Sequence, residues 1–312
     1  MKSKIKTIDC QYLKNEFASA YLMIEKDEAL FIDNNTNSAI PILLNSMKES
    51  NIKNEDIRYL IITHIHLDHA GATSSLIKLF PNATVLAHPK AAPHLISPRR
   101  IIEGASAVYG KDNFQKLYGE ITEIPESRIR IMQDGETIKF GDRDLKFIFT
   151  RGHANHHFVI HDSETNAIFT GDSFGISYPN MKESGSPFLI PSTTPTDFDA
   201  LEAKISVQKI LDTKADYAYL THFDKWTNMQ DGAEQLIEGI EKMEMIIQQL
   251  LSNDFDFEQQ KAFTEKKISD YYHQKLNSKN IPNQVLDFLK EDIMINAMGI
   301  NFTSNRLKKK MS

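Results

Sequence analysis

Cysteine and long apolar runs are scarce in this sequence. With one cysteine in 312 residues no internal disulfide can form, and Cys10, in a strand-like run, is expected to be a small core residue. No apolar run approaches the ~18–20 residues that a membrane span requires. Met1 to Leu13 also lacks the apolar core of a signal peptide. The sequence therefore predicts a cytoplasmic protein that has no membrane partner.

Dense positive charge is also missing. The formal net charge is -6, and the one basic run, Arg306 to Lys310, stands near the end of the chain. So short a run supplies few phosphate contacts, which argues against nucleic acid as a partner. Hydrophobic residues at 41% and charged residues at 25% are typical of a globular protein of one large or two ordinary domains. We expect its partner to be a small-molecule substrate.

What the sequence does contain is a cluster of imidazoles. The stretch 63–69 reads Thr-His-Ile-His-Leu-Asp-His and follows an apolar run, Tyr59 to Ile62, that is expected to be a buried strand. His64 and His66 are two apart, so at a strand end they point to the same side. Titratable side chains this close are buried only when a positive partner holds them, and a metal ion is the simplest such partner. One ion can take His64 and His66, and a second ion Asp68 and His69.

Three later strand-like runs each end in a ligand-type side chain. These side chains are His153, after Leu145 to Phe149; Asp172, after Ala167 to Thr170; and His222, after Tyr217 to Leu220. Strands alternate with helices along the chain, among them a helix from Ala72 to Phe80 that Gly71 opens, and this order is typical of layered α/β folds. Loops at one edge of such sheets form metal sites, so we expect these side chains to gather there.

Two other regions are expected to be helical. The segment of about residues 88–128 is interrupted by prolines and too long for a simple connection, which predicts a helical insert, and long insertions near a site are often lids. Apolar residues at three- and four-residue spacing predict helices at Glu234 to Leu251, Phe257 to Leu276 and Pro282 to Met298. We expect one domain at 1–228 and a C-terminal helical extension at 229–312 that packs on it. That extension either covers the site or forms a homodimer face.

The order of these motifs resembles that of the metallo-β-lactamase superfamily. The matching pieces, within about residues 5–225, are His64-x-His66-x-Asp68-His69, Gly152-His153, Gly171-Asp172 and Thr221-His222. The resemblance implies an α/β fold, the αββα sandwich, with a binuclear site at one edge. It also implies the ligands: His64, His66 and His153 for one ion; Asp68, His69 and His222 for the other; and Asp172 as a bridge.

The chemistry of these residues agrees with that resemblance. Imidazole and carboxylate ligands suit Zn²⁺, and also Fe or Mn. Two such ions lower the pKa of a shared water from ~15.7 to about 7, which gives a metal-bridging hydroxide at neutral pH. Asp68 can orient that hydroxide and shuttle its proton. The sequence thus predicts a binuclear metallo-hydrolase of an ester, thioester, lactone or related substrate, which resembles the glyoxalase-II-like branch.

Two other functions remain open at this point. An iron-dependent redox protein of the same fold, a sulfur dioxygenase or a diiron oxygen-binding sensor, is the main alternative. The diiron flavoproteins carry glutamate where this chain has His66, and a persulfide dioxygenase would leave the second set of ligands unused, which favours hydrolysis. The other alternative is a non-catalytic module, but structural metal sites are usually closed and cysteine-rich.

Five further residues are candidates for roles around the metals. His157, Tyr178 and Phe174 are predicted substrate contacts, and strand alternation predicts that only one of His156 and His157 faces the site. Asp33 ends a strand beside the motif strand. It either hydrogen-bonds the metal loop or caps the following helix.

Overall fold

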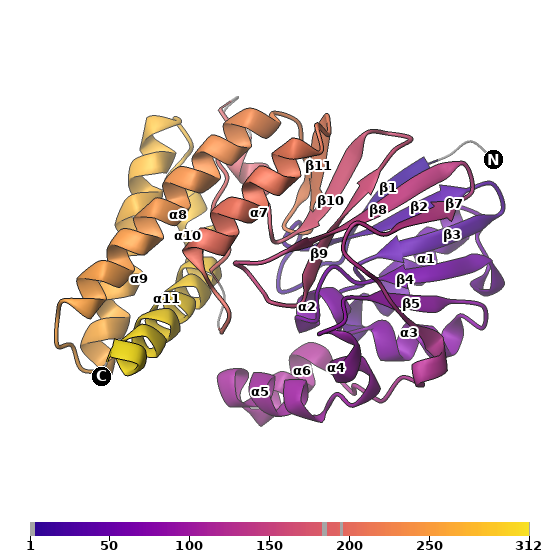
Figure 1. Cartoon of the computed structure of the whole chain (residues 1–312), viewed down its shortest axis with the longest axis horizontal. Coiled ribbons are helices and arrows are strands. Elements are labelled where there is room, and N and C mark those ends of the chain that lie inside the picture. The colour runs from indigo at the N-terminus through magenta and orange to yellow at the C-terminus, as the bar shows by residue number, and fades with distance from the viewer. Residues whose placement is uncertain (1–3, 183–185, 194–195, 312) are drawn as a thin grey trace. The chain divides into compact units, whose positions relative to one another are not determined.

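The computed structural model describes residues 4–182, 186–193 and 196–311 (Figure 1). The chain divides into two compact units. The first, here the sheet unit, comprises Met1–Phe149, His156–Gly171 and Tyr217–Lys225; the second, the helical unit, comprises Thr150–Asn155, Asp172–Asp216 and Trp226–Ser312. The helical unit takes in more than the predicted extension at 229–312, and the domain boundary at residue 228 stays a prediction.

The first sheet of the sheet unit carries the histidine motif. In spatial order its strands are β1 (Lys4–Asp9), β2 (Ser19–Glu25), β3 (Glu28–Ile32), β4 (Ile57–Ile61), β5 (Thr84–Ala87) and β6 (Ile129–Ile131). β1 to β3 are antiparallel, whereas β3 to β6 run parallel. Every residue of β2 is buried, as expected of an apolar strand that is covered on both faces.

The second sheet supplies three of the predicted strand ends. In spatial order its strands are β12 (Asp224–Trp226), β11 (Tyr217–Leu220), β10 (Ala167–Gly171), β9 (His157–Asp162), β8 (Arg143–Thr150) and β7 (Thr137–Phe140). β10 is parallel to β11 and antiparallel to β9. The two sheets enclose one apolar cluster, in which Tyr21 of β2 meets Phe169 of β10 edge to face at 5.2 Å between ring centroids.

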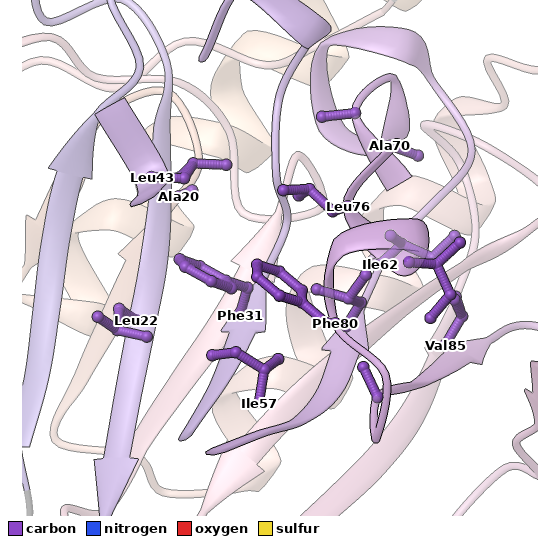
Figure 2. Packing of buried hydrophobic residues seen from close by; sticks show 14 of the residues in the cluster. Ala20, Leu22, Phe31, Leu43, Ile57, Ile62, Ala70, Leu76, Phe80 and Val85 are labelled. Atoms are coloured by element: carbon purple, nitrogen blue, oxygen red, sulfur yellow. The ribbon is translucent and has the colours of Figure 1, made fainter. Parts of the chain in front are cut away.

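A second apolar cluster lies on the other face of the first sheet. Two of the helices that close it are α1 (Ile40–Glu49) and α3 (Thr73–Leu79), which contribute Leu43 and Leu76 (Figure 2). Phe31 of β3 stacks on Phe80, the C-cap residue that follows α3, with 6.1 Å between ring centroids. Packing on both faces of this sheet holds the motif-bearing end of β4 in place.

The predicted insert folds as three short helices, α4 (Ala92–Ile96), α5 (Arg99–Tyr109) and α6 (Lys111–Tyr118). The helical character of this segment agrees with the prediction. Helices of about two turns show little periodicity, so α4 and α6 were not predicted as separate helices. Leu95 of α4 is buried in the apolar cluster behind the first sheet, which ties the insert to the fold.

The helical unit is built from α7 (Ala200–Asp212), α8 (Met229–Leu251), α9 (Phe257–Ser278), α10 (Gln284–Phe288) and α11 (Lys290–Met311). α8 packs against α7, and α11 against α8 and α9. Lys204 pairs with Glu244 at 2.6 Å across α7 and α8. The predicted single helix at Pro282 to Met298 is wrong, because the chain breaks at Leu289 between α10 and α11. No helix within the described ranges is both long and apolar enough to cross a membrane.

Candidate metal centre

The histidine motif leaves β4 and enters a four-residue helix, α2 (Leu67–Ala70). Gly71 is the C-cap residue of this helix. The helix predicted at Ala72 to Phe80 is confirmed as α3, Thr73–Leu79, with Ala72 and Phe80 as its cap residues. The ring of His64 lies 4.4 Å from that of His66 and 4.1 Å from that of His69, centroid to centroid. The prediction that His64 and His66 share one side of the chain is confirmed.

Asp68, His69 and His222 converge within the sheet unit. One ligand atom from each lies within 4.8 Å of the others. Asp68 Oδ2 is 3.3 Å from His222 Nε2 and 3.8 Å from His69 Nε2. His222 reaches this point from the end of β11, 153 positions after His69 (222 − 69). The pairing of the motif with a distant strand end agrees with the prediction, while the ligand roles themselves stay predictions.

Hydrogen bonds fix which nitrogen each of these imidazoles presents. His69 Nδ1 lies 2.7 Å from Asp33 Oδ2, and His222 Nδ1 lies 2.8 Å from the carbonyl oxygen of Phe17. A carboxylate and a carbonyl only accept, so both Nδ1 atoms carry the proton and donate. When neutral, each ring therefore turns an Nε2 lone pair toward Asp68. Two imidazole nitrogens and a carboxylate oxygen form a donor set that fits a divalent transition metal.

Asp33 is the centre of the hydrogen bonds behind this group. Its carboxylate is 1% exposed and accepts from the backbone N–H of Thr63 at 2.8 Å and from Thr221 Oγ1 at 2.9 Å, besides His69. Of the two roles left open, the hydrogen bond to the metal loop is confirmed. The following 3₁₀ turn has Thr36 as its N-cap residue. One buried carboxylate thus orients His69 directly, as outer partners of metal-binding histidines do, and also holds Thr221, the residue before His222.

Two asparagines after Asp33 were not singled out from the sequence. The backbone N–H of Asn34 donates to the carbonyl of His69 at 2.8 Å, and Asn35 Nδ2 donates to that of Asp68 at 2.9 Å. Asn35 has φ +57°, a conformation that asparagine tolerates better than most residues. Consecutive asparagines at a strand end were the available signal, and they clamp α2 against β3.

His153 and Asp172 belong to the helical unit. His153 Nε2 lies 3.5 Å from Asp172 Oδ2, and Ser192 Oγ donates to the same oxygen at 3.2 Å. These residues line a cavity of about 20 Å³, which has room for one water. Along the chain His153 follows β8 and Asp172 directly follows β10. Their roles as ligands stay predictions.

Two consecutive histidines lie beside the motif. His157 opens β9, is fully buried and stacks on His64 with 4.8 Å between ring centroids. His156 is half-buried, and its ring centroid is 5.5 Å from that of His66. His156 precedes the strand, so strand alternation does not apply to it, and the expectation that only one of the two faces the site stays a prediction.

The other two predicted substrate contacts are buried in the helical unit. Tyr178 is fully buried, donates from its hydroxyl to Asp292 Oδ1 at 2.9 Å and meets Phe288 edge to face. Phe174 is also fully buried and lies so close to Gly232 that a Cβ there would be 3.0 Å from its ring. Substrate contact stays a prediction for both and for His157, and their burial favours packing roles.

Gly171, just before Asp172, is predicted to be essential for packing behind the motif. It has φ +49°, and a Cβ there would lie 2.5 Å from His157 Nε2 and 2.7 Å from Thr63 Oγ1. Gly171→Ala is expected to lower the free energy of unfolding by about 1–3 kcal/mol through overpacking. Gly104 in α5 has no atom within 4 Å of such a Cβ, so Gly104→Ala should stabilise by roughly 0.5–1 kcal/mol. Urea unfolding compares the two, and equal stabilities would contradict this reading.

Comparison with known proteins identifies the family. Residues 14–222 match the sequence profile of the Metallo-beta-lactamase superfamily, which is well over half of the chain. The chain belongs to the metallo-beta-lactamase superfamily. Two solved superfamily structures share its fold, at TM-scores of 0.66 for a protein from Sulfolobus tokodaii and 0.64 for one from Thermus thermophilus. The alignment with the first, at 20% identity, covers 95% of this chain and 97% of the Sulfolobus tokodaii protein. The alignment with the second, at 17% identity, covers 97% of this chain and 93% of the Thermus thermophilus protein. The predicted αββα fold class is confirmed.

Curated superfamily relatives are similar over part of their length. A metallo-beta-lactamase fold-containing protein of Sulfurisphaera tokodaii is 25% identical over 184 residues, 58% of this chain and 63% of that protein. A probable hydroxyacylglutathione hydrolase of Schizosaccharomyces pombe is 26% identical over 159 residues, 49% of this chain and 48% of that protein. The N-acyl homoserine lactonase AttM of Agrobacterium fabrum is 27% identical over 143 residues, which are 45% of this chain and 50% of that protein. The chain thus spans 48% to 63% of the length of these relatives.

Proposed function

We propose that this chain is a metal-dependent hydrolase that acts on an ester, thioester, lactone or related substrate. The observation that supports this most is the convergence of Asp68, His69 and His222, with both imidazoles held through Nδ1 so that Nε2 is turned toward the carboxylate. Two relatives, named as a hydroxyacylglutathione hydrolase and an N-acyl homoserine lactonase, support a carbonyl substrate. The substrate proposed is a small molecule.

The cofactor proposed is a pair of divalent ions, with zinc as the first choice and iron or manganese as alternatives. Asp68, His69 and His222 would hold one ion, and His64 and His66 contribute to the other. We propose His153 and Asp172 as the remaining ligands because of their place in the order of residues along the chain. When bound, such ions lower the pKa of water to about 7 and polarise the substrate carbonyl.

The residues of the chain have separate tasks in this proposal. Asp68 is the one acidic group among the motif residues, and its side chain is 26% exposed, so it can be reached by water. It accepts a hydrogen bond from the attacking water, aligns it with the carbonyl and carries the proton to the leaving group. His69 and His222 keep fixed tautomers because Asp33 and the Phe17 carbonyl hold their Nδ1 protons.

Metal quantification alongside a substrate panel tests the proposal. Protein purified without added metal is expected to hold about two zinc ions per chain and to hydrolyse at least one aryl ester, thioester or lactone. Chelator should remove the turnover, and added Zn²⁺ should restore it. Bound iron with an oxygen-dependent change in absorbance would instead favour the redox alternative. Metal-loaded protein that turns over no member of the panel would count against hydrolysis.

A further inference from the structure

His156 is an imidazole beside the motif to which the hydrolysis proposed above gives no task. Its ring centroid lies 5.5 Å from that of His66, nearly perpendicular, and 6.1 Å from that of His64, nearly parallel. His156 and His66 are half-buried, whereas His64 and His157 are fully buried. Of the two consecutive histidines, His156 is therefore the one that keeps an exposed edge beside the motif.

One hydrogen bond fixes the tautomer of this ring. The backbone N–H of Ile65, the residue between His64 and His66, donates to His156 Nδ1 at 3.5 Å. Because that nitrogen accepts, a neutral ring carries its proton on Nε2. His156 thus has an N–H donor on the side of the ring away from the backbone of the motif.

We propose that His156 is a substrate-binding residue whose Nε2–H donates to an acyl oxygen of the substrate and to a carboxylate oxygen of the product. This rests on the proposed function, because it names a substrate contact of the same site. A donor that is already oriented stabilises the negative charge that develops on such an oxygen without further reorganisation. The competing role is structural: His156 would serve only to accept from Ile65 and so brace the motif.

Two amide variants separate these roles. Asparagine places its amide near the position of Nδ1, so His156→Asn keeps an acceptor for Ile65 and loses the outer donor. Glutamine reaches the position of Nε2, so His156→Gln keeps the outer donor and loses the inner acceptor. His273, exposed on α9, provides a matched control as His273→Asn.

The primary measurement is calorimetric binding of 4-hydroxybutanoate, the product of opening γ-butyrolactone, to the full chain with its metal content determined. His156→Asn is expected to weaken binding about tenfold, and His156→Gln by less than about threefold. Metal content should equal that of the unchanged protein in both variants. The unfolding midpoint should be unchanged in His156→Asn and lower in His156→Gln, which leaves the buried Ile65 N–H without its acceptor. His273→Asn should bind as the unchanged protein does.

The other outcomes contradict the proposal in distinct ways. If the glutamine variant weakens binding and the asparagine variant does not, His156 acts through Ile65 and the substrate contact is refuted. If the unchanged protein does not bind 4-hydroxybutanoate, the contact is refuted as well. Turnover of γ-butyrolactone is measured separately. Binding of 4-hydroxybutanoate without turnover of any panel member would refute the hydrolase function. The comparison of the two variants would still test the contact made by His156.

Discussion

Asp68→Asn is expected to lower kcat/KM on a lactone or aryl ester by about 10³-fold or more. Asp68 Oδ2 lies 3.8 Å from His69 Nε2 and 3.3 Å from His222 Nε2. An amide oxygen is a weaker ligand, and an amide cannot take a proton from water at neutral pH. Both consequences lower the rate. The loss should fall on kcat, because the carboxylate acts on the attacking water and not on the substrate.

The fold should survive this change, since the Asp68 side chain is partly exposed and asparagine has nearly the same shape. The measurements are turnover on the panel, metal content and the urea midpoint. Asp27→Asn, at the exposed turn between β2 and β3, is the matched control and should leave all three unchanged. Asp68→Asn protein that holds its metal and still turns over at the original rate would refute the role assigned to this carboxylate.

Much of the candidate site was predictable because short local patterns in the sequence indicate it. The apolar run before Thr63 predicted β4, and residues two apart at its end predicted that His64 and His66 share a side. Strand-end positions also marked His222. These predictions rest on the period of a strand, which is set by backbone geometry and does not depend on the rest of the fold.

The parts that were missed depend on contacts between distant residues or on very short elements. The acceptor for His222 Nδ1 is a backbone carbonyl, that of Phe17, which any residue could supply, so no side-chain pattern marks it. α2 is one turn long and has no periodicity to detect. The break between α10 and α11 at Leu289 lies inside an apolar pattern that continues across it. Neither local propensity nor spacing carries this information.

Asp33→Asn is expected to weaken metal binding about 10- to 100-fold, the usual effect of removing the carboxylate partner of a metal-binding histidine. Asparagine replaces one acceptor oxygen of the side chain with an NH₂ donor. If that donor faces His69, the Nδ1–H of the imidazole loses its acceptor, and the ring must present the other tautomer. If the amide flips, the donor instead faces the N–H of Thr63. In either arrangement two buried N–H donors face each other, and one of them has lost its acceptor.

Stability should fall together with metal affinity, because Asp33 is buried and accepts from Thr63, His69 and Thr221. We expect Asp33→Asn to lower the free energy of unfolding of the metal-free protein by about 1–3 kcal/mol. Thr221→Val removes one donor to the same carboxylate and leaves His69 paired, so it should cost about 1 kcal/mol and change metal affinity little. Competition with a chelator measures the affinity, and urea unfolding the stability. If Asp33→Asn lost stability but bound metal as tightly as Thr221→Val, Asp33 would brace the fold without orienting His69.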